Sequence, residues 1–319
     1  STSITSGGLV TFSIKINGNT IPDEINIVNI TIDKAVNTIA SAKINILDGN
    51  PEAKTFKISS SNTFVPGNTL AIEAGYDNSN ALIFKGIITK QNISINDIDG
   101  SILEIECRDE TIKMSVGRKS LTFSNQKDSD IISSIISTYS GLTAAVSSTT
   151  VQWPELVQYY ATDWDFILTR AETNGLLITT LNGKVSVFPP DGATSSVLDI
   201  EYGNNMLECN VSLNAVTQFN AVKASAWDYK NQTVVSKTVT NNHAGPGNLS
   251  SKKLSKVIGL KNYELQTTAP LQASDLTNWS KATLVKSAYS KIQGEVKFQG
   301  SNVVEAGKYV TLDGLGDRF

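Results

Sequence analysis

The stretch VTFSIKING, residues 10–18, decides the class of the fold. Its apolar side chains, from Val10 to Ile16, alternate with polar ones, and the pair Asn17-Gly18 ends the stretch. A period of two that is rich in β-branched and aromatic residues is typical of a strand with one buried face. Asn-Gly is the dipeptide that most favours a tight turn between two such strands. The stretch therefore predicts an antiparallel β protein.

Short alternating stretches of the same kind recur through the first third of the chain. They lie near residues 28–32, 42–46, 70–72, 82–84 and 103–107. Many short strands separated by Asx-Gly turns are typical of an antiparallel barrel or sandwich. We assign residues 1–118 to a first antiparallel β-barrel.

The pattern changes to mixed helix and strand in residues 119–198, which we assign to an α+β insert. Ser129 can cap a helix whose isoleucines recur at helical spacing, and Gly141 can end it. A second helix opens at Thr162, with Asp165 three residues further on as a variant of the capping box. The pair Asn182-Gly183 then indicates a two-residue hairpin.

Strand patterns resume in residues 199–319, which also contain a long helical pattern near 274–292. Residues 65–72 and 305–312 resemble one another, because each presents a glycine, two spacer residues and then alternating apolar positions. We therefore expect a second barrel like the first. The first barrel continues through several strands after Ile72, whereas the sequence stops shortly after Leu312, so we expect this second barrel to be incomplete at its C-terminus.

Composition excludes several classes of partner. The formal net charge is −3, and no dense Lys/Arg run gives the basic face that nucleic-acid binding needs. Only 18% of the residues are charged, below the roughly 25% of typical soluble domains. This low fraction fits a subunit with a large protein–protein interface. No apolar run of transmembrane length and no signal-peptide pattern is present, so we expect synthesis in the cytoplasm.

Catalytic, cofactor and metal sites are not expected. The single histidine, His243, lies in a predicted loop, and the two cysteines, Cys107 and Cys209, are too far apart for a metal or redox motif. We interpret both cysteines as free, buried strand residues. Asp163 and Asp165 flank Trp164 and could suggest glycosidase chemistry, but acidic residues in a first helical turn more commonly complement the helix dipole. We therefore expect no enzyme activity.

The run from Tyr159 to Gly175 is the most specific stretch of the sequence. It reads YYATDWDFILTRAETNG, and it resembles the signature of VgrG proteins: a tyrosine pair, then D-W-D-F, then R-A-E-x-N-G. Residues 65–89 and 316–319 also resemble this family. The matching positions are Tyr159, Tyr160, Asp163, Trp164, Asp165, Phe166, Arg170, Ala171, Glu172, Asn174 and Gly175. We interpret them as determinants of fold and assembly, and expect Trp164 and Phe166 to be buried.

The resemblance implies the hub and spike base of a type VI secretion system or a related phage-tail-like particle. In that family two hub barrels from each of three subunits form a ring. This implies a homotrimer that contacts a hexameric tube ring on one side and a trimeric, membrane-puncturing spike on the other. Baseplate proteins would be further partners, as would spike-tip or effector proteins bound through a region beyond Phe319. Firing would deliver the protein to the extracellular space or a target cell.

Two other readings stay open. The first is a phage or tailocin baseplate hub, since barrels in this region serve the same purpose in each machine. The second is a carbohydrate-binding adhesin, because such proteins share a strand-rich composition with many Ser, Thr and Asn residues.

Overall fold

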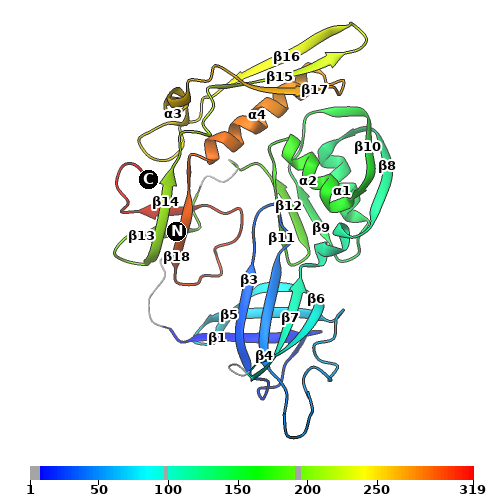
Figure 1. The fold of residues 1–319 in the computed structure, drawn as a ribbon, viewed down its shortest axis with the longest axis vertical. Coiled ribbons are helices and arrows are strands. Elements are labelled where there is room, and N and C mark those ends of the chain that lie inside the picture. The colour runs from blue at the N-terminus through cyan, green and yellow to red at the C-terminus, as the bar shows by residue number, and fades with distance from the viewer. Residues whose placement is uncertain (1–7, 97–99, 191–194) are drawn as a thin grey trace.

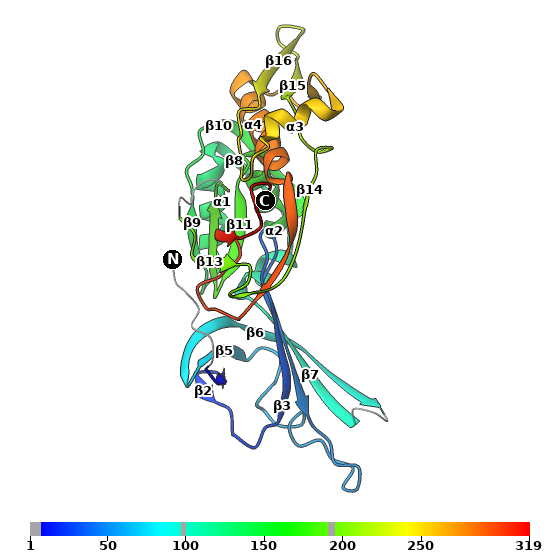
Figure 2. The same cartoon turned by 90° about the vertical axis from the view of Figure 1, so that its left-hand side faces the viewer.

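The computed structural model describes residues 8–96, 100–190 and 195–319, and strands dominate it (Figure 1). The predicted mainly β fold class is confirmed. The molecule is elongated, as Figure 2 shows: a large sheet forms one end and a small sheet with two helices forms the other. The remaining elements lie between these two ends.

The first part of the chain forms one seven-stranded antiparallel sheet in the order β2-β1-β5-β6-β7-β4-β3. Its strands follow the predicted alternation, because Ile14, Ile44 and Ile72 are buried while their neighbours in sequence are more exposed. The strands are β1 (Val10–Ile16), β2 (Asn19–Thr20), β3 (Ile27–Asp33), β4 (Ser41–Leu47), β5 (Thr69–Tyr76), β6 (Ser79–Asn96) and β7 (Gly100–Arg108).

The long strand β6 bends this sheet. Residues 79–87 of β6 pair with β5, whereas residues 87–96 pair with β7, and the register shifts in both ladders. Such irregularities increase local twist and turn the corner of a sheet. The order nevertheless ends at β2 and β3, and no pairing among the described strands joins these two ends. Among the described residues, the strands predicted to form a first barrel therefore form a bent, open sheet.

The α+β insert follows. Its two-stranded sheet β10-β8 and three-stranded sheet β11-β12-β9 enclose two helices whose apolar faces are buried. The predicted hairpin is confirmed, with Asn182 and Gly183 both at positive φ. The elements are the 3-10 helix η1 (Glu110–Ser115), β8 (Arg118–Lys127), α1 (Asp128–Ser137), β9 (Thr143–Val146), β10 (Gln152–Thr162), α2 (Asp163–Thr173), β11 (Leu177–Leu181) and β12 (Lys184–Phe188).

The cap predicted for the first helix is wrong. Helix α1 begins at Asp128, its N-cap is Lys127, and Ser129 lies inside the first turn. The amide of Ser129 donates to Thr149 Oγ1 at 3.0 Å instead. Ser129 therefore lies inside the helix, and its amide is satisfied by a side chain 20 residues away in the sequence.

The last part of the chain does not form one sheet. Strands β13 and β19 pair in parallel, β14 pairs with β18, and β16-β15-β17 form a third small sheet. The predicted second barrel is thus replaced by three small sheets, with helix α4 packed against β15 and β16. The elements are β13 (Leu198–Glu201), β14 (Met206–Leu213), β15 (Ala221–Asp228), β16 (Thr233–Thr240), α3 (Ser251–Ile258), β17 (Tyr263–Thr267), α4 (Ala273–Tyr289), β18 (Ile292–Phe298) and β19 (Val310–Asp313).

The sequence echo between residues 65–72 and 305–312 is a local one. Gly67 and Gly307 both have positive φ, of 101° and 79°. In each copy the residue after this glycine donates its amide to the carbonyl three residues back, at 3.0 and 3.1 Å, and a strand follows. However, β5 lies between two antiparallel neighbours, whereas β19 pairs in parallel with β13. The turn and strand are therefore repeated, and their place in a sheet is not.

In the described residues, no helix combines the length and the apolar character needed to cross a lipid bilayer.

Candidate functional site

The motif run, residues 159–175, spans the end of β10, helix α2 and the turn after it. Thr162 is the N-cap of α2: its Oγ1 accepts from the amide of Asp165 at 3.0 Å and donates to the Asp165 carboxylate at 2.7 Å. Trp164 and Phe166 are buried, at 7% and 8% exposure, as predicted. Phe166 stacks on Phe123 of β8, with ring centroids 5.8 Å apart. The first turn of α2 is thus anchored by a cap and by the aromatic core.

Asp163 is the centre of a first buried network. Its carboxylate accepts from Lys119 Nζ and the Tyr139 hydroxyl, both at 2.6 Å, and from Gln158 Nε2 at 2.9 Å. Burial pushes the pKa of this carboxyl upward, but the three hydrogen bonds outweigh it and the pKa lies below its ordinary value. Hydrogen bonding to Asp163 also raises the pKa of Lys119. Both groups are therefore held in their charged forms.

Arg170 and Asn174 belong to a second buried network, centred on Asp128. Arg170 donates to both oxygens of Asp128, from Nε at 2.6 Å and from Nη2 at 3.0 Å, and Asn174 Nδ2 donates at 2.8 Å. The indole of Trp153 donates to the same carboxylate at 3.1 Å, and the guanidinium lies 4.8 Å from its ring centroid. Such a bidentate, stacked arrangement fixes geometry strongly. It ties α2 to the start of α1 and to β10.

The turn that ends the run accommodates a neighbouring helix. Gly175 has a φ of 69°, and a Cβ there would lie 3.0 Å from the Cα of Ala282 in α4. Ala171, also in the motif, is fully buried. The absence of a side chain at Gly175 allows α4 to approach the insert closely.

Four residues of the motif run are exposed to solvent rather than buried. Tyr159 and Tyr160 are 83% and 64% exposed, and Asp165 and Glu172 lie on the exposed face of α2. The two tyrosines share one side because β10 shifts register between Gln158 and Ala161, where Tyr160 takes a φ of 44°. A bulge of this kind breaks the alternation that would bury one tyrosine of the pair. The motif therefore has a buried, structural half and an exposed half.

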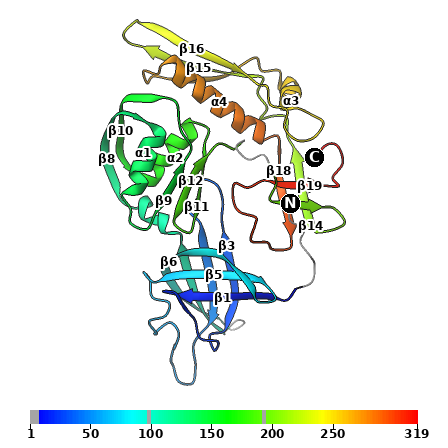
Figure 3. The same ribbon diagram turned by 180° about the vertical axis from the view of Figure 1, so that it is seen from behind.

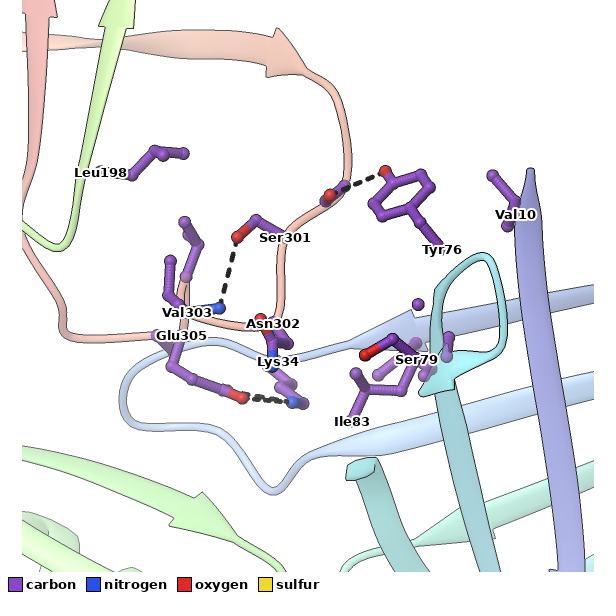
Figure 4. Close-up of a pocket in the computed structure, with 16 residues that line it drawn as sticks. Val10, Lys34, Tyr76, Ser79, Ile83, Leu198, Ser301, Asn302, Val303 and Glu305 are labelled. Carbon is purple, nitrogen blue, oxygen red and sulfur yellow. Dashed lines mark hydrogen bonds and ion pairs between the residues drawn. The ribbon is translucent and has the colours of Figure 1, made fainter. Parts of the chain in front are cut away.

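A cavity of about 870 Å³ lies between the first sheet and residues 300–306 (Figure 4). Lys34 Nζ binds both oxygens of Glu305 at 2.9 Å on one side of it. The hydroxyl of Tyr76 donates to the carbonyl of Gly300 at 2.8 Å on the other side. No local sequence pattern indicates this site, because its contacts join residues more than 200 positions apart. Its charged side chains, Lys34 and Glu305, are paired with each other. The geometry therefore indicates a contact between the first sheet region and residues 300–306 rather than a reaction centre.

The carboxylate pair considered for sugar chemistry does not share a cleft. Asp163 is buried within its own network, whereas Asp165 is exposed and bonded to Thr162. His243 lies in a loop, as predicted, and its amide donates to Asn241 Oδ1. In the residues that the structure describes, no three His, Cys, Asp or Glu side chains gather as metal ligands.

Both cysteines are free strand residues, as predicted, but they differ in burial. Cys107 of β7 is fully buried, whereas Cys209 of β14 is half-buried. Burial raises the pKa of the Cys107 thiol to about 12.

Lys291 was not singled out from the sequence, yet it is one of the most buried residues, at 1% exposure. Its ammonium donates to three backbone carbonyls of one loop: Ala244 at 3.2 Å, Leu249 at 2.8 Å, and Pro246. Burial lowers the pKa of this amine. A buried lysine with only carbonyl partners leaves no pattern in a sequence by which it could be found.

The model of the protein family described as "Alg8 N-terminal domain" matches residues 6–319. A search of curated proteins gave no significant match.

Solved structures give clear similarities of fold. A 43 kDa tail protein of prophage MuSo2 from Shewanella oneidensis has a TM-score of 0.66 at 13% identity, over 95% of this chain and 88% of that one. A tail protein from Neisseria meningitidis MC58 also has a TM-score of 0.66, at 12% identity, over 95% and 86%. Prophage tail protein gp18 from Listeria monocytogenes has a TM-score of 0.53 at 9% identity, over 84% and 76%. The chain therefore has the fold of phage tail proteins, while its resemblance to VgrG proteins stays a hypothesis.

Proposed function

We propose that the chain is a hub subunit of a contractile, phage-tail-like machine. By its match over residues 6–319, the chain belongs to the family of the Alg8 N-terminal domain. The observation that carries this proposal is the similarity to two phage tail proteins over 95% of the chain. That similarity spans the first sheet, the insert and the last region together, so it concerns the whole arrangement rather than one common small sheet.

The finer role that we propose is that of a VgrG-like spike base. Three copies would form a ring that joins a hexameric tube to a trimeric spike, with baseplate proteins at its rim and effectors carried at its tip. The motif run supports this role, because its buried half holds the insert in shape while Tyr159 and Tyr160 remain available for assembly. A phage or tailocin baseplate hub would use the same surfaces and is the second candidate.

The proposed location follows from this role. Assembly would take place in the cytoplasm, and firing would carry the ring to the extracellular space or into a target cell. The motif residues are proposed to act in fold and assembly, with no catalytic step assigned to them.

Light scattering coupled to size exclusion tests the homotrimer. The 319-residue chain at micromolar concentration should give about three times the mass of 34.3 kDa, and electron microscopy should show a threefold ring. A single species with the mass of one chain at every concentration would contradict the ring. A stable dimer with a twofold axis would contradict it as well.

A further inference from the structure

A smaller cavity, of about 260 Å³, lies where helix α4 faces the insert. Figure 1 and Figure 3 show α4 between the β16-β15-β17 sheet and the insert helices α1 and α2, and α4 contacts both β15 and α2. Residues of α1, β10 and α2 form one wall of the cavity, and residues of the segment 267–279 form the other. Cavities that hold drug-sized ligands measure about 300–1,000 Å³, so this one suits a smaller group.

Asp275 of α4 brings an unmatched charge to this cavity. It is 8% exposed, and its Oδ2 accepts from the amide of Gln272 at 2.8 Å. Its Oδ1 has no hydrogen-bond partner among the described residues. Burial raises the pKa of this carboxyl by more than the nearby Arg170 lowers it. Buried charges in proteins are normally paired, so this carboxylate lacks a donor or a cation.

The other charged side chains of the wall neutralise one another. Arg170 binds both oxygens of Asp128 and lies against the ring of Trp153. The lining therefore contains two carboxylates and one guanidinium, which gives a formal charge of −1. Among the described residues that line the cavity, Asp275 is the charged group without an opposite charge bound to it. The cavity therefore favours a cation.

Two tryptophans and aliphatic groups complete the wall. Trp153 and Trp279 both line the cavity, together with Val151 and Leu271. The face of a tryptophan ring is the side-chain surface that attracts organic cations most strongly. The aliphatic groups suit the methylene chain that carries an ammonium. A hydrated metal ion fits less well, because it needs several oxygen ligands and gains nothing from an apolar wall.

We propose that this cavity binds an alkylammonium group, with its ammonium at Asp275 and its methylenes against Trp279 and Leu271. A free amine and a lysine side chain of another protein share this chemistry. The inference goes beyond the proposed function and does not depend on the ring, since every residue that it uses lies in one chain. It also places two residues of the motif run, Arg170 and Asn174, in the lining of a binding site.

Titration with n-butylammonium chloride at low salt tests the site. In protein labelled with ¹⁵N-tryptophan, the indole signals of Trp153 and Trp279 should shift with a Kd of about 1 mM, an affinity within reach of so small a ligand. Trp227 is an internal control, because it is 39% exposed and lies outside the lining, and its signal should not shift. Butan-1-ol has the same shape without the charge and should bind about 10-fold more weakly or worse.

Asp275→Asn removes the charge and keeps an acceptor for the amide of Gln272. It should weaken butylammonium binding about 10-fold or more, and its Tm should equal or exceed that of the wild type, because an unpaired buried charge is lost. The matched control Asp23→Asn lies in the exposed turn before β3 and should leave the Kd within about twofold. If Asp275→Asn fails to fold, the comparison of butylammonium with butan-1-ol on the wild type decides.

Nα-acetyl-lysine methylamide distinguishes the two sources of the ammonium. A Kd like that of butylammonium would indicate a lysine side chain, whereas binding about 10-fold weaker would indicate a free amine, and either result supports the inference. Equal binding of butan-1-ol, unchanged binding by Asp275→Asn, or shifts at Trp227 as large as those at Trp279 would overturn it. Shifts with glucose and none with butylammonium would assign the cavity to hydroxyl ligands and overturn it as well. Failure of the ring would leave all of these outcomes unchanged.

Discussion

The first sheet and the last region of the chain were built from the same kind of sequence, yet they are held together differently. In the first sheet, Ile44, Leu70 and Phe84 belong to one continuous apolar core, each at most 1% exposed. In the described residues of the β15–β17 sheet and α4, one buried apolar cluster contains only the small residues Ala224 and Ala226 with Leu276, and its other members, such as Leu265 and Trp279, are only partly buried. An alternating pattern thus predicts a buried face without telling how large the resulting core is.

Buried polar groups add to the apolar ones in the last region. Gln218 donates to the carbonyl of Ser287 at 2.7 Å, and Ser287 donates to the carbonyl of Thr217 at 2.6 Å. Asn241 donates to Ser251 Oγ at 2.7 Å, and Lys291 holds its loop. Each such bond contributes about 1 kcal/mol net, but leaving a partner unpaired costs more. The stability of the last region therefore depends in part on the geometry of its buried hydrogen bonds, whereas the stability of the first sheet depends mainly on buried apolar area.

The largest expected effect is in the first core. Replacing Phe84 by Ala should lower the free energy of unfolding by about 3–5 kcal/mol, because a fully buried aromatic leaves a cavity. Urea unfolding followed by circular dichroism gives the value. Phe12→Ala is the matched control on the same sheet, since Phe12 is 49% exposed and should cost much less. Equal costs for the two would refute the single-core description.

Removing Leu276 should cost less than removing Phe84. Leu276 is fully buried, but its core is small, so Leu276→Ala should cost about 2 kcal/mol, at the lower end for a buried leucine. The same unfolding experiment measures it. A cost above that of Phe84→Ala would show that the last region depends on apolar packing as much as the first sheet does.

Lys291→Met should have a smaller and local effect. Methionine keeps the length of the side chain but leaves the carbonyls of Ala244, Pro246 and Leu249 without their donor. We expect a loss of about 1 kcal/mol, because the exposed loop can turn these carbonyls to water. Hydrogen exchange should rise in residues 244–249 and stay unchanged in the first sheet. Uniformly faster exchange over the whole chain would contradict a local role.

The two cysteines report the same contrast without a change in stability. Cys209 should react with a maleimide in the native protein, whereas Cys107 should react only after unfolding, because it is fully buried and its thiol pKa is about 12. Raising the pH from 7 to 9 should therefore leave Cys107 unlabelled. Mass spectrometry of peptides after timed labelling distinguishes the two, and early labelling of Cys107 would show that the first sheet opens readily.

Local structure was predictable where nearby residues decide it. The cap of α2 at Thr162, the Asn182-Gly183 hairpin and the burial of Trp164 and Phe166 follow from positions a few residues apart. Ser129 is not the cap because α1 begins one residue before it, at Asp128, and Thr149, 20 residues further on, bonds the Ser129 amide. The candidate site also has a part that local sequence predicts and a part that it does not. No pattern within residues 159–175 indicates that Asp128 is the partner of Arg170.

Alternation, Asx-Gly turns and capping residues were enough to predict the β class, the Asn182-Gly183 hairpin and the start of the motif helix. The tertiary structure alone decided which strands pair, so that similar turn–strand stretches at Gly67 and Gly307 entered an antiparallel and a parallel ladder. It also decided where Lys291 is buried and that Trp153 of the insert and Trp279 of α4 line one cavity. The physical reason is that alternation and turn residues act over a few positions. Strand pairing, burial of a charge and the lining of a cavity depend on contacts between residues far apart in the chain.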